Sequence, residues 1–68
     1  MKPNLGRRVR AWRRAGWWTS GDLARAAGMH GSGLSRVEHG KQALTAAQAE
    51  AIVHALGLSM AEFYGRLP

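Results

Sequence analysis

The stretch of sequence that decides the fold spans residues 19–40 and reads TSGDLARAAGMHGSGLSRVEHG. It holds two short segments with apolar residues at helical spacing, 19–27 and 31–39, joined by the turn GMH at 28–30. Two short helices joined by a brief turn that contains glycine are typical of a helix-turn-helix. Other small helical bundles can show the same pattern, so the stretch predicts two helices and a turn without yet indicating a function.

The two segments of this stretch begin differently. Thr19 stands three residues before Asp22, in an arrangement that resembles a capping box, and Trp18 precedes it in the position of a hydrophobic staple. The second segment opens with GSG at 31–33, and each glycine disfavours a helix by about 1 kcal/mol relative to alanine. We therefore expect a well-defined start for the first helix and a weak start for the second.

Three more helices are expected outside this pair. One runs from about Asn4 to Ala15 and ends at Gly16, and the two that follow the pair open with capping boxes, TAAQ at 45–48 and SMAE at 59–62. No segment shows the strict alternation of a half-buried strand. The sequence thus predicts an all-α fold of five helices, organised as one domain over residues 1–68. The expected core positions are Leu5, Val9, Trp12, Leu23, Ala24, Ala27, Leu34, Val37, Ala49, Ile52, Val53 and Leu56.

Length and composition exclude several classes of protein. A chain of 68 residues buries only about 60% of the surface that its unfolded form exposes, so self-association would help to stabilise it. The lack of cysteine excludes disulfides and Cys-based zinc sites. No apolar run reaches the roughly 20 residues of a membrane span, and the basic N-terminus has no apolar stretch behind it as a secretory signal would. We expect a cytoplasmic protein that is complete in this one domain.

The charge is strongly positive and unevenly distributed. The formal net charge is +6 and the isoelectric point is near 11.5. Residues 1–41 hold nine Lys and Arg against two acids, whereas residues 42–68 hold one Arg against two acids. A basic front and a nearly neutral back indicate a surface that faces a polyanion and a separate packing surface. The alternative is that the arginines only keep the first helix solvated.

Several stretches together resemble one known family. LGRRVRAW at 5–12, WTSGDLARAAGM at 18–29, GLSRVEHGK at 33–41 and ALGLSMAEFY at 55–64 stand in the order and at the spacing of the Xre/Cro/phage-repressor helix-turn-helix family. The resemblance covers nearly the whole chain. It implies a lambda-repressor-like domain that binds duplex DNA as a repressor-like transcriptional regulator, with helix 31–39 in the major groove. It also implies a homodimer on a palindromic site.

The sequence departs from the family at three places. Ser20 stands where the family usually has a phosphate-binding glutamine, Trp17 stands where it usually has glycine, and the recognition helix opens with GSG at 31–33 instead of large or polar side chains. These changes weaken the case for base-specific reading. They leave open an alternative from another class, a protein-interaction module that keeps the fold and binds a partner protein.

Four residues are expected to face DNA bases. A helix that enters the major groove presents side chains from its N-terminus and from one turn later. These positions are Gly31, Ser32, Ser35 and Arg36. Arg36 is the side chain among them that can make a bidentate contact with guanine O6 and N7, although a phosphate or surface role is the alternative. The serines can donate a hydrogen bond to a base edge or a phosphate.

Phosphate contacts are expected on either side of the recognition helix. Thr19 and Ser20 lie at a helix N-terminus, where hydroxyls and free backbone amides suit an anion. Lys41 and Gln42 follow the recognition helix and resemble the family's backbone-contacting loop. The alternative for Lys41 is an ordinary solvated lysine.

The resemblance also implies one structural pair and a dimer surface. An arginine late in the first helix and a glutamate late in the recognition helix often pair in the family, and here these are Arg13 and Glu38. The dimer interface is expected at the last helix and the turn before it. Its residues would be Leu58, Met60, Phe63 and Tyr64, unless Phe63 instead completes the monomer core.

Trp17 and Trp18 are adjacent, so both cannot face the core on most backbones. Trp18 matches the family's core position. We expect Trp17 to be partly exposed and to cover the seam between the first and last helices, with contact to a partner as the alternative.

Neither catalysis nor metal binding is expected. His30, His39 and His54 lie on three different segments, without the spacing of a pair of metal ligands on one helix face. The glycine-rich stretch at 28–33 is not a phosphate loop, because no strand precedes it. A domain this small has no room to bury an active site. We expect no enzyme activity, no metal and no cofactor.

Overall fold

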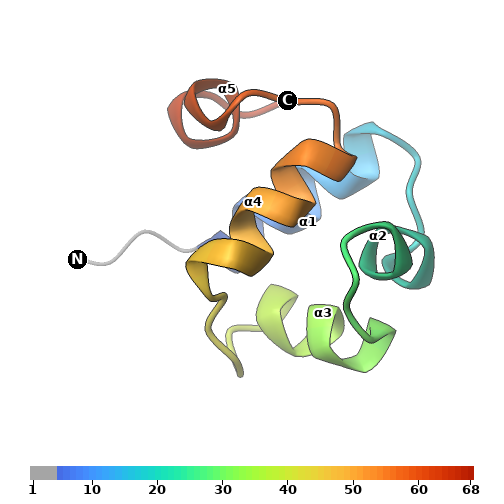
Figure 1. Cartoon of the computed structure of the whole chain (residues 1–68). Coiled ribbons are helices and arrows are strands. Elements are labelled where there is room, and N and C mark those ends of the chain that lie inside the picture. The colour runs from blue at the N-terminus through green and yellow to red at the C-terminus, as the bar shows by residue number, and fades with distance from the viewer. Residues whose placement is uncertain (1–4) are drawn as a thin grey trace.

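The computed structural model describes residues 5–68, and Asn4, where the first helix was expected to begin, lies outside that range. Within it the chain forms five helices and no strand, which confirms the predicted all-α class (Figure 1). The turn between the second and third helices lies where it was predicted. The helices are α1 (Leu5–Ala15), α2 (Ser20–Ala26), α3 (Gly31–Glu38), α4 (Ala46–Ala55) and α5 (Met60–Gly65).

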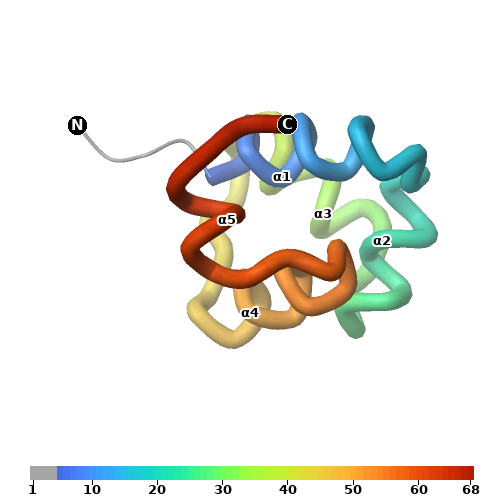
Figure 2. The backbone as a smooth tube through the Cα atoms, turned by 90° about the horizontal axis from the view of Figure 1, so that it is seen from above, coloured from blue at the N-terminus to red at the C-terminus, as the bar shows by residue number. Residues whose placement is uncertain are grey.

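The arrangement of the helices places α3 and α5 at opposite ends of the molecule (Figures 1 and 2). Helix α2 packs against α3 and α4, α1 packs against α3 and α5, and α5 also packs against α4. In the view from above, α5 is nearest the viewer on the left of the molecule, and α3 lies deeper and further right, between α5 and α2 (Figure 2). One surface of α3 is therefore left uncovered by the other helices.

The hydrophobic core draws residues from all five helices. Its largest fully buried side chains are Phe63, Leu23, Leu34, Ile52 and Val9. The burial of Phe63 corrects the expectation that it belongs to a dimer interface. Because α5 packs back onto α1 and α4, its one fully buried aromatic ring completes the monomer core and is not available to a partner.

Helices α4 and α5 begin with complete capping boxes. Thr45 and Gln48 exchange side-chain and backbone hydrogen bonds at 3.1 Å in both directions, and Ser59 and Glu62 do so at 3.0 Å. The bonds donated by the Ser59 backbone and hydroxyl hold the pKa of Glu62 below its ordinary value. At each of these two helix starts, the side chains that cap the backbone N–H groups lie within three positions of them.

The caps of α2 and α3 are less complete. The hydroxyl of Thr19 accepts from the backbone N–H of Asp22 at 3.0 Å, but the Asp22 carboxylate lies 3.5 Å from Arg25 instead of returning to the cap. His30 is the N-cap of α3 and makes no side-chain cap bond. The helix ends at Glu38 with His39 as its C-cap, slightly before the predicted end.

Four helices end with the same pair of backbone hydrogen bonds, the Schellman motif. Gly28, Gly40 and Gly57 occupy its left-handed position with φ of 70°, 74° and 74°. At the end of α1 that position falls on Trp17, with φ of 62°, and not on Gly16. A non-glycine residue in this conformation costs roughly 1–2 kcal/mol.

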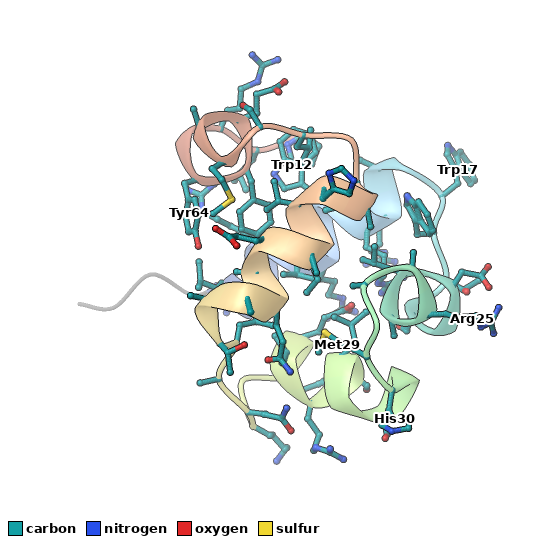
Figure 3. All side chains as sticks on the ribbon, viewed as in Figure 1. Trp12, Trp17, Arg25, Met29, His30 and Tyr64 are labelled. Carbon is teal, nitrogen blue, oxygen red and sulfur yellow. The ribbon has the colours of Figure 1, made fainter. Side chains whose placement is uncertain are left out.

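The side chain of Trp17 is 94% exposed and points away from the body of the molecule (Figure 3). The expectation that it covers the seam between α1 and α5 is therefore wrong. The left-handed backbone turns Trp17 outward, while the next residue, Trp18, turns inward and packs against the core.

Close approach of α1 to α3 depends on Gly6, which is buried in the first turn of α1. A Cβ at this position would overlap the carbonyl oxygen of Val37 and would lie 3.2 Å from the Cα of Glu38. Only glycine lets the two backbones meet this closely. This contact sets the position of the C-terminal half of α3.

Candidate nucleic-acid interface

The outer face of α3 carries the residues predicted to contact bases. Leu34 and Val37 are buried beneath the helix, which turns Ser32 and Arg36 outward, where both are exposed. Ser35 and Gly31 are half-buried at the margins of this face. The structure thus gathers these four residues on one uncovered helix surface at one end of the molecule (Figure 1).

The N-termini of α2 and α3 lie close together. A Cβ at Gly31 would be 3.6 Å from the Cα of Gly21, so the first turns of the two helices are in contact. Thr19 is exposed and Ser20 half-buried beside this contact. The Thr19 hydroxyl accepts from the Asp22 amide and keeps its own proton to donate. Two helix N-termini at one place give a local excess of positive partial charge.

The loop after α3 is tied back to the helix. The backbone N–H of Lys41 donates to the carbonyl of Arg36 at 2.8 Å, and the Lys41 side chain is exposed. Gln42 is half-buried, and its Oε1 accepts from Nε of Arg36 at 3.0 Å. Arg36 and Gln42, which were expected to make separate contacts with DNA, are therefore joined to each other.

Arg13 and Glu38 form a bidentate ion pair. Nε and Nη2 of Arg13 donate to the two carboxylate oxygens of Glu38 at 2.8 and 2.9 Å, and Nη1 donates to the Trp18 carbonyl at 2.9 Å. The Glu38 side chain is 3% exposed and that of Arg13 is 15% exposed. This planar pairing satisfies two desolvated charges and joins α1, the α1–α2 connection and α3.

Not all of the basic residues in the first part of the chain are available to a polyanion. Nη1 of Arg8 donates to the carbonyls of Phe63 and Arg66 at 3.2 and 3.1 Å, which satisfies the C-terminus of α5. Arg13 is likewise held in an ion pair within the fold. The basic surface is therefore smaller than the number of basic residues in 1–41 suggests. The roles of Gly6, Arg8 and the Arg36–Gln42 pair were not predicted, because no motif at these residues indicates which side chain or backbone group each one contacts.

The surface of α5 carries exposed apolar side chains. Met60 and Tyr64 are each 40% exposed, and Leu67 follows them with greater exposure. The ring of Tyr64 meets that of Phe63 edge-on, with centroids 5.1 Å apart, and lies at the side of the molecule away from α2 (Figure 3). Leu58, before the helix, is half-buried against the core. Of the four residues predicted for a dimer interface, three keep some exposed surface.

The histidines serve separate parts of the structure. Nδ1 of His39 lies 2.7 Å from the Ser35 carbonyl, to which it donates, and His30 projects beside the start of α3 (Figure 3). Within residues 5–68 no three His, Cys, Asp or Glu side chains gather as metal ligands would. In the same part of the chain, no helix has the length and hydropathy needed to cross a membrane.

Comparisons with known proteins agree with this geometry. A protein family described as "Helix-turn-helix domain" matches residues 4–63. Two crystal structures of the clp gene regulator ClgR from Corynebacterium glutamicum are similar at 30% sequence identity, with TM-scores of 0.82 and 0.84. The match covers 88% of this chain, and 77% and 64% of the two ClgR chains. No curated protein matches the sequence significantly.

Proposed function

Because the chain belongs to the helix-turn-helix domain family, we propose that it is a repressor-like transcriptional regulator of the Xre/Cro/phage-repressor type. In this proposal α3 enters the major groove of duplex DNA in the cytoplasm, without a cofactor and without catalysis. The observation that carries the proposal is the outer face of α3. It exposes Ser32 and Arg36, while the buried Arg13–Glu38 pair fixes the helix from behind.

In this arrangement the base contacts divide by chemistry. Arg36 reads guanine through two N–H groups, and Ser32 and Ser35 donate to a base edge or a nearby phosphate. Gly31 has no side chain and lets the backbone approach the groove closely. Because Arg36 is the one residue of these four that can make a bidentate contact with a base, the proposal predicts a modest preference for DNA sequence.

The phosphate contacts supply most of the affinity. Thr19, Ser20 and the amides at the adjoining starts of α2 and α3 meet one strand, and Lys41 meets the other. Affinity for DNA is therefore expected to fall steeply as the salt concentration rises.

The affinity is tested with Lys41→Ala on mixed-sequence duplex across a range of salt concentrations. Loss of this side chain should weaken binding to all sequences about equally and flatten the log–log salt slope by about one. The matched control is Arg66→Ala, since Arg66 follows α5 at the far end of the molecule and should leave the slope unchanged. A wild-type affinity that does not depend on salt would contradict the proposal.

The proposal includes a symmetric dimer on a palindromic site. Met60, Tyr64 and Leu58 would form its interface, without Phe63. Tyr64 lies at a side of the molecule, so two copies joined there can both present α3 to the same duplex (Figure 3). Half-sites would lie roughly 34 Å apart, and two modest half-site affinities would combine through effective concentration.

Sedimentation of the free protein and of its DNA complex tests the dimer. Two copies per duplex are expected, and Tyr64→Glu should reduce this to one without unfolding the chain, because Tyr64 is partly exposed. A single copy in both states, on a site without palindromic symmetry, would rule the dimer out.

Trp17 favours a second candidate function, a protein-interaction module. The Trp17 side chain is 94% exposed, and its left-handed backbone conformation is energetically costly. Tryptophan is enriched among the residues that contribute most to protein–protein binding. This candidate predicts that a random pool of duplexes yields no enriched site. Regulation of transcription by DNA binding predicts that it does, and that Trp17→Ala leaves the enriched site unchanged.

A further inference from the structure

Arg36 does not stand alone on the outer face of α3. Its guanidinium is hydrogen-bonded to Gln42 and lies beside Gly33, which comes one helical turn earlier. Arg36 and Gln42 differ from the other expected DNA contacts, because their side chains are hydrogen-bonded to each other before any DNA is bound.

We infer that Gln42 is a positioning residue that sets the guanine preference of Arg36, and that Gly33 provides the space in which the two side chains meet. This inference rests on the proposed DNA-binding function and extends it. Gln42 was expected only to contact phosphate. The inference instead gives it a role in the recognition of DNA sequence.

The geometry of the Arg36–Gln42 bond leaves one edge of the guanidinium available to a base. Gln42 Oε1 accepts from Nε of Arg36 at 3.0 Å, which occupies the inner edge of the guanidinium. The two Nη groups remain as a planar pair of donors on the outer edge. A guanine presents O6 and N7 side by side and binds such a pair in a bidentate manner. Fixing Nε therefore selects one of the orientations in which an arginine can approach a base.

Gly33 is buried within α3. This glycine lies on the turn of α3 beneath Arg36, and residues three apart on a helix are neighbours. A Cβ placed there would be 3.9 Å from Nη2 of Arg36 and 4.0 Å from Nε2 of Gln42, so both end groups lie over it. A long side chain would occupy the same place. This explains a glycine that is otherwise unfavourable within a helix.

The bond to Gln42 also lowers the entropic cost of ordering the Arg36 side chain on DNA. A free arginine loses much of its rotamer freedom when it binds a base, and an arginine already held by a neighbour loses less. The Arg36–Gln42 bond joins α3 to the loop that follows it, and that loop is itself held by the Lys41–Arg36 backbone bond. The Arg36 side chain is thus held in place by Gln42 and by the loop that follows α3.

The test begins with selection of duplexes from a random pool by the wild-type protein. Affinity is then measured on the selected duplex, on the same duplex with the preferred G·C pair replaced by A·T, and on mixed-sequence duplex. Arg36→Ala should remove the preference for G·C, a loss of roughly tenfold or more. Gln42→Ala should reduce that preference by about two- to tenfold, with little change on mixed-sequence duplex and an unchanged salt slope.

Two glycine variants complete the test. Gly33→Ala places its methyl group in ordinary contact with the pair and should keep the G·C preference. Gly33→Gln should reduce it as Gln42→Ala does. Circular dichroism of each variant establishes that the fold is retained.

The outcomes separate the inference from the function on which it rests. If the wild type binds no duplex, both are overturned. If Arg36→Ala removes the G·C preference and Gln42→Ala does not change it, the inference is wrong and DNA binding stands. If Gln42→Ala weakens binding to all duplexes equally, Gln42 is a phosphate contact and the inference is again wrong.

Discussion

The start of α3 contrasts with the starts of α4 and α5. Thr45 and Ser59 each begin a helix with a complete capping box, whereas α3 begins at His30 without a side-chain cap and continues through two glycines. The helices that frame the core are stabilised by their own sequence. Helix α3, which carries the proposed DNA-binding face, has a weak start, and its first backbone N–H groups have no side-chain cap.

The C-terminal end of α3, unlike its start, is held by contacts with other parts of the fold. Gly6 lets α1 approach Val37 closely, and the Arg13–Glu38 ion pair holds the last turn against α1 and the α1–α2 connection. Helix α3 is therefore positioned by tertiary contacts at its C-terminal end, whereas its N-terminal end has no side-chain cap. The contrast teaches that the placement of α3 depends on its packing against α1 more than on its own helix propensity.

The largest effect is expected where this support is removed. Glu38→Ala leaves Arg13 partly buried without its partner, which should cost about 3–5 kcal/mol of unfolding free energy. Urea denaturation or the melting temperature measures the loss. Glu50→Ala, on the exposed surface of α4, is the control and should change little. Equal stability of the two variants would mean that the pair does not hold α3.

A smaller loss is expected from Gly6→Ala. The added methyl group must push α1 away from the Val37 carbonyl, and overpacking of this kind costs about 1–3 kcal/mol. Gly21→Ala is the matched control, because nothing lies within 4 Å of a Cβ there. We expect thermal unfolding to show a loss for the first variant and no loss for the second. A stable Gly6→Ala variant would show that α1 and α3 can separate without cost.

Variants of the capping residues test the contrast between the helix starts directly. Thr45→Ala and Ser59→Ala should each cost about 1 kcal/mol, because each removes a hydroxyl that accepts from a helix N-terminal amide. His30→Ala should cost almost nothing, since His30 makes no side-chain cap bond. Denaturant titration of the three variants measures the differences. A loss for His30→Ala as large as the other two would remove the contrast between the helix starts.

The smallest effect is expected at the end of α1, where Trp17 stands in a position that glycine holds at the ends of α2, α3 and α4. Trp17→Gly should raise stability by about 0.5–1 kcal/mol, because the relief of left-handed strain exceeds the entropic cost of glycine. Gly57→Ala, the reverse change in the same motif, should lower it. A melting temperature that falls in Trp17→Gly would mean that the indole makes stabilising contacts despite its exposure.

The elements that could be predicted from sequence are those whose signals are local. The Thr45 and Ser59 capping boxes and the glycine turn at 28–30 each depend on residues within a few positions, and they mark helix boundaries well. The Arg13–Glu38 pair spans two helices. It was anticipated only through the family resemblance.

The features that sequence reasoning missed, or left open as in the case of Phe63, depend on where helices meet. The burial of Phe63 follows from the packing of α5 on α1 and α4, and the bonds of Arg8 reach carbonyls at the opposite end of the chain. At the end of α1 a shift of one residue moved the left-handed position from Gly16 to Trp17. No periodicity or spacing in the sequence contains this information.

The central claim is that the outer face of α3 meets DNA. Chemical-shift mapping of the backbone amides during titration with mixed-sequence duplex tests it most directly, since nonspecific binding uses the same surface. The account predicts that the largest shifts fall at 31–36, at Thr19 and Ser20, and at Lys41 and Gln42. Shifts concentrated at Trp17 or on α5, or no shifts at low salt, would contradict it.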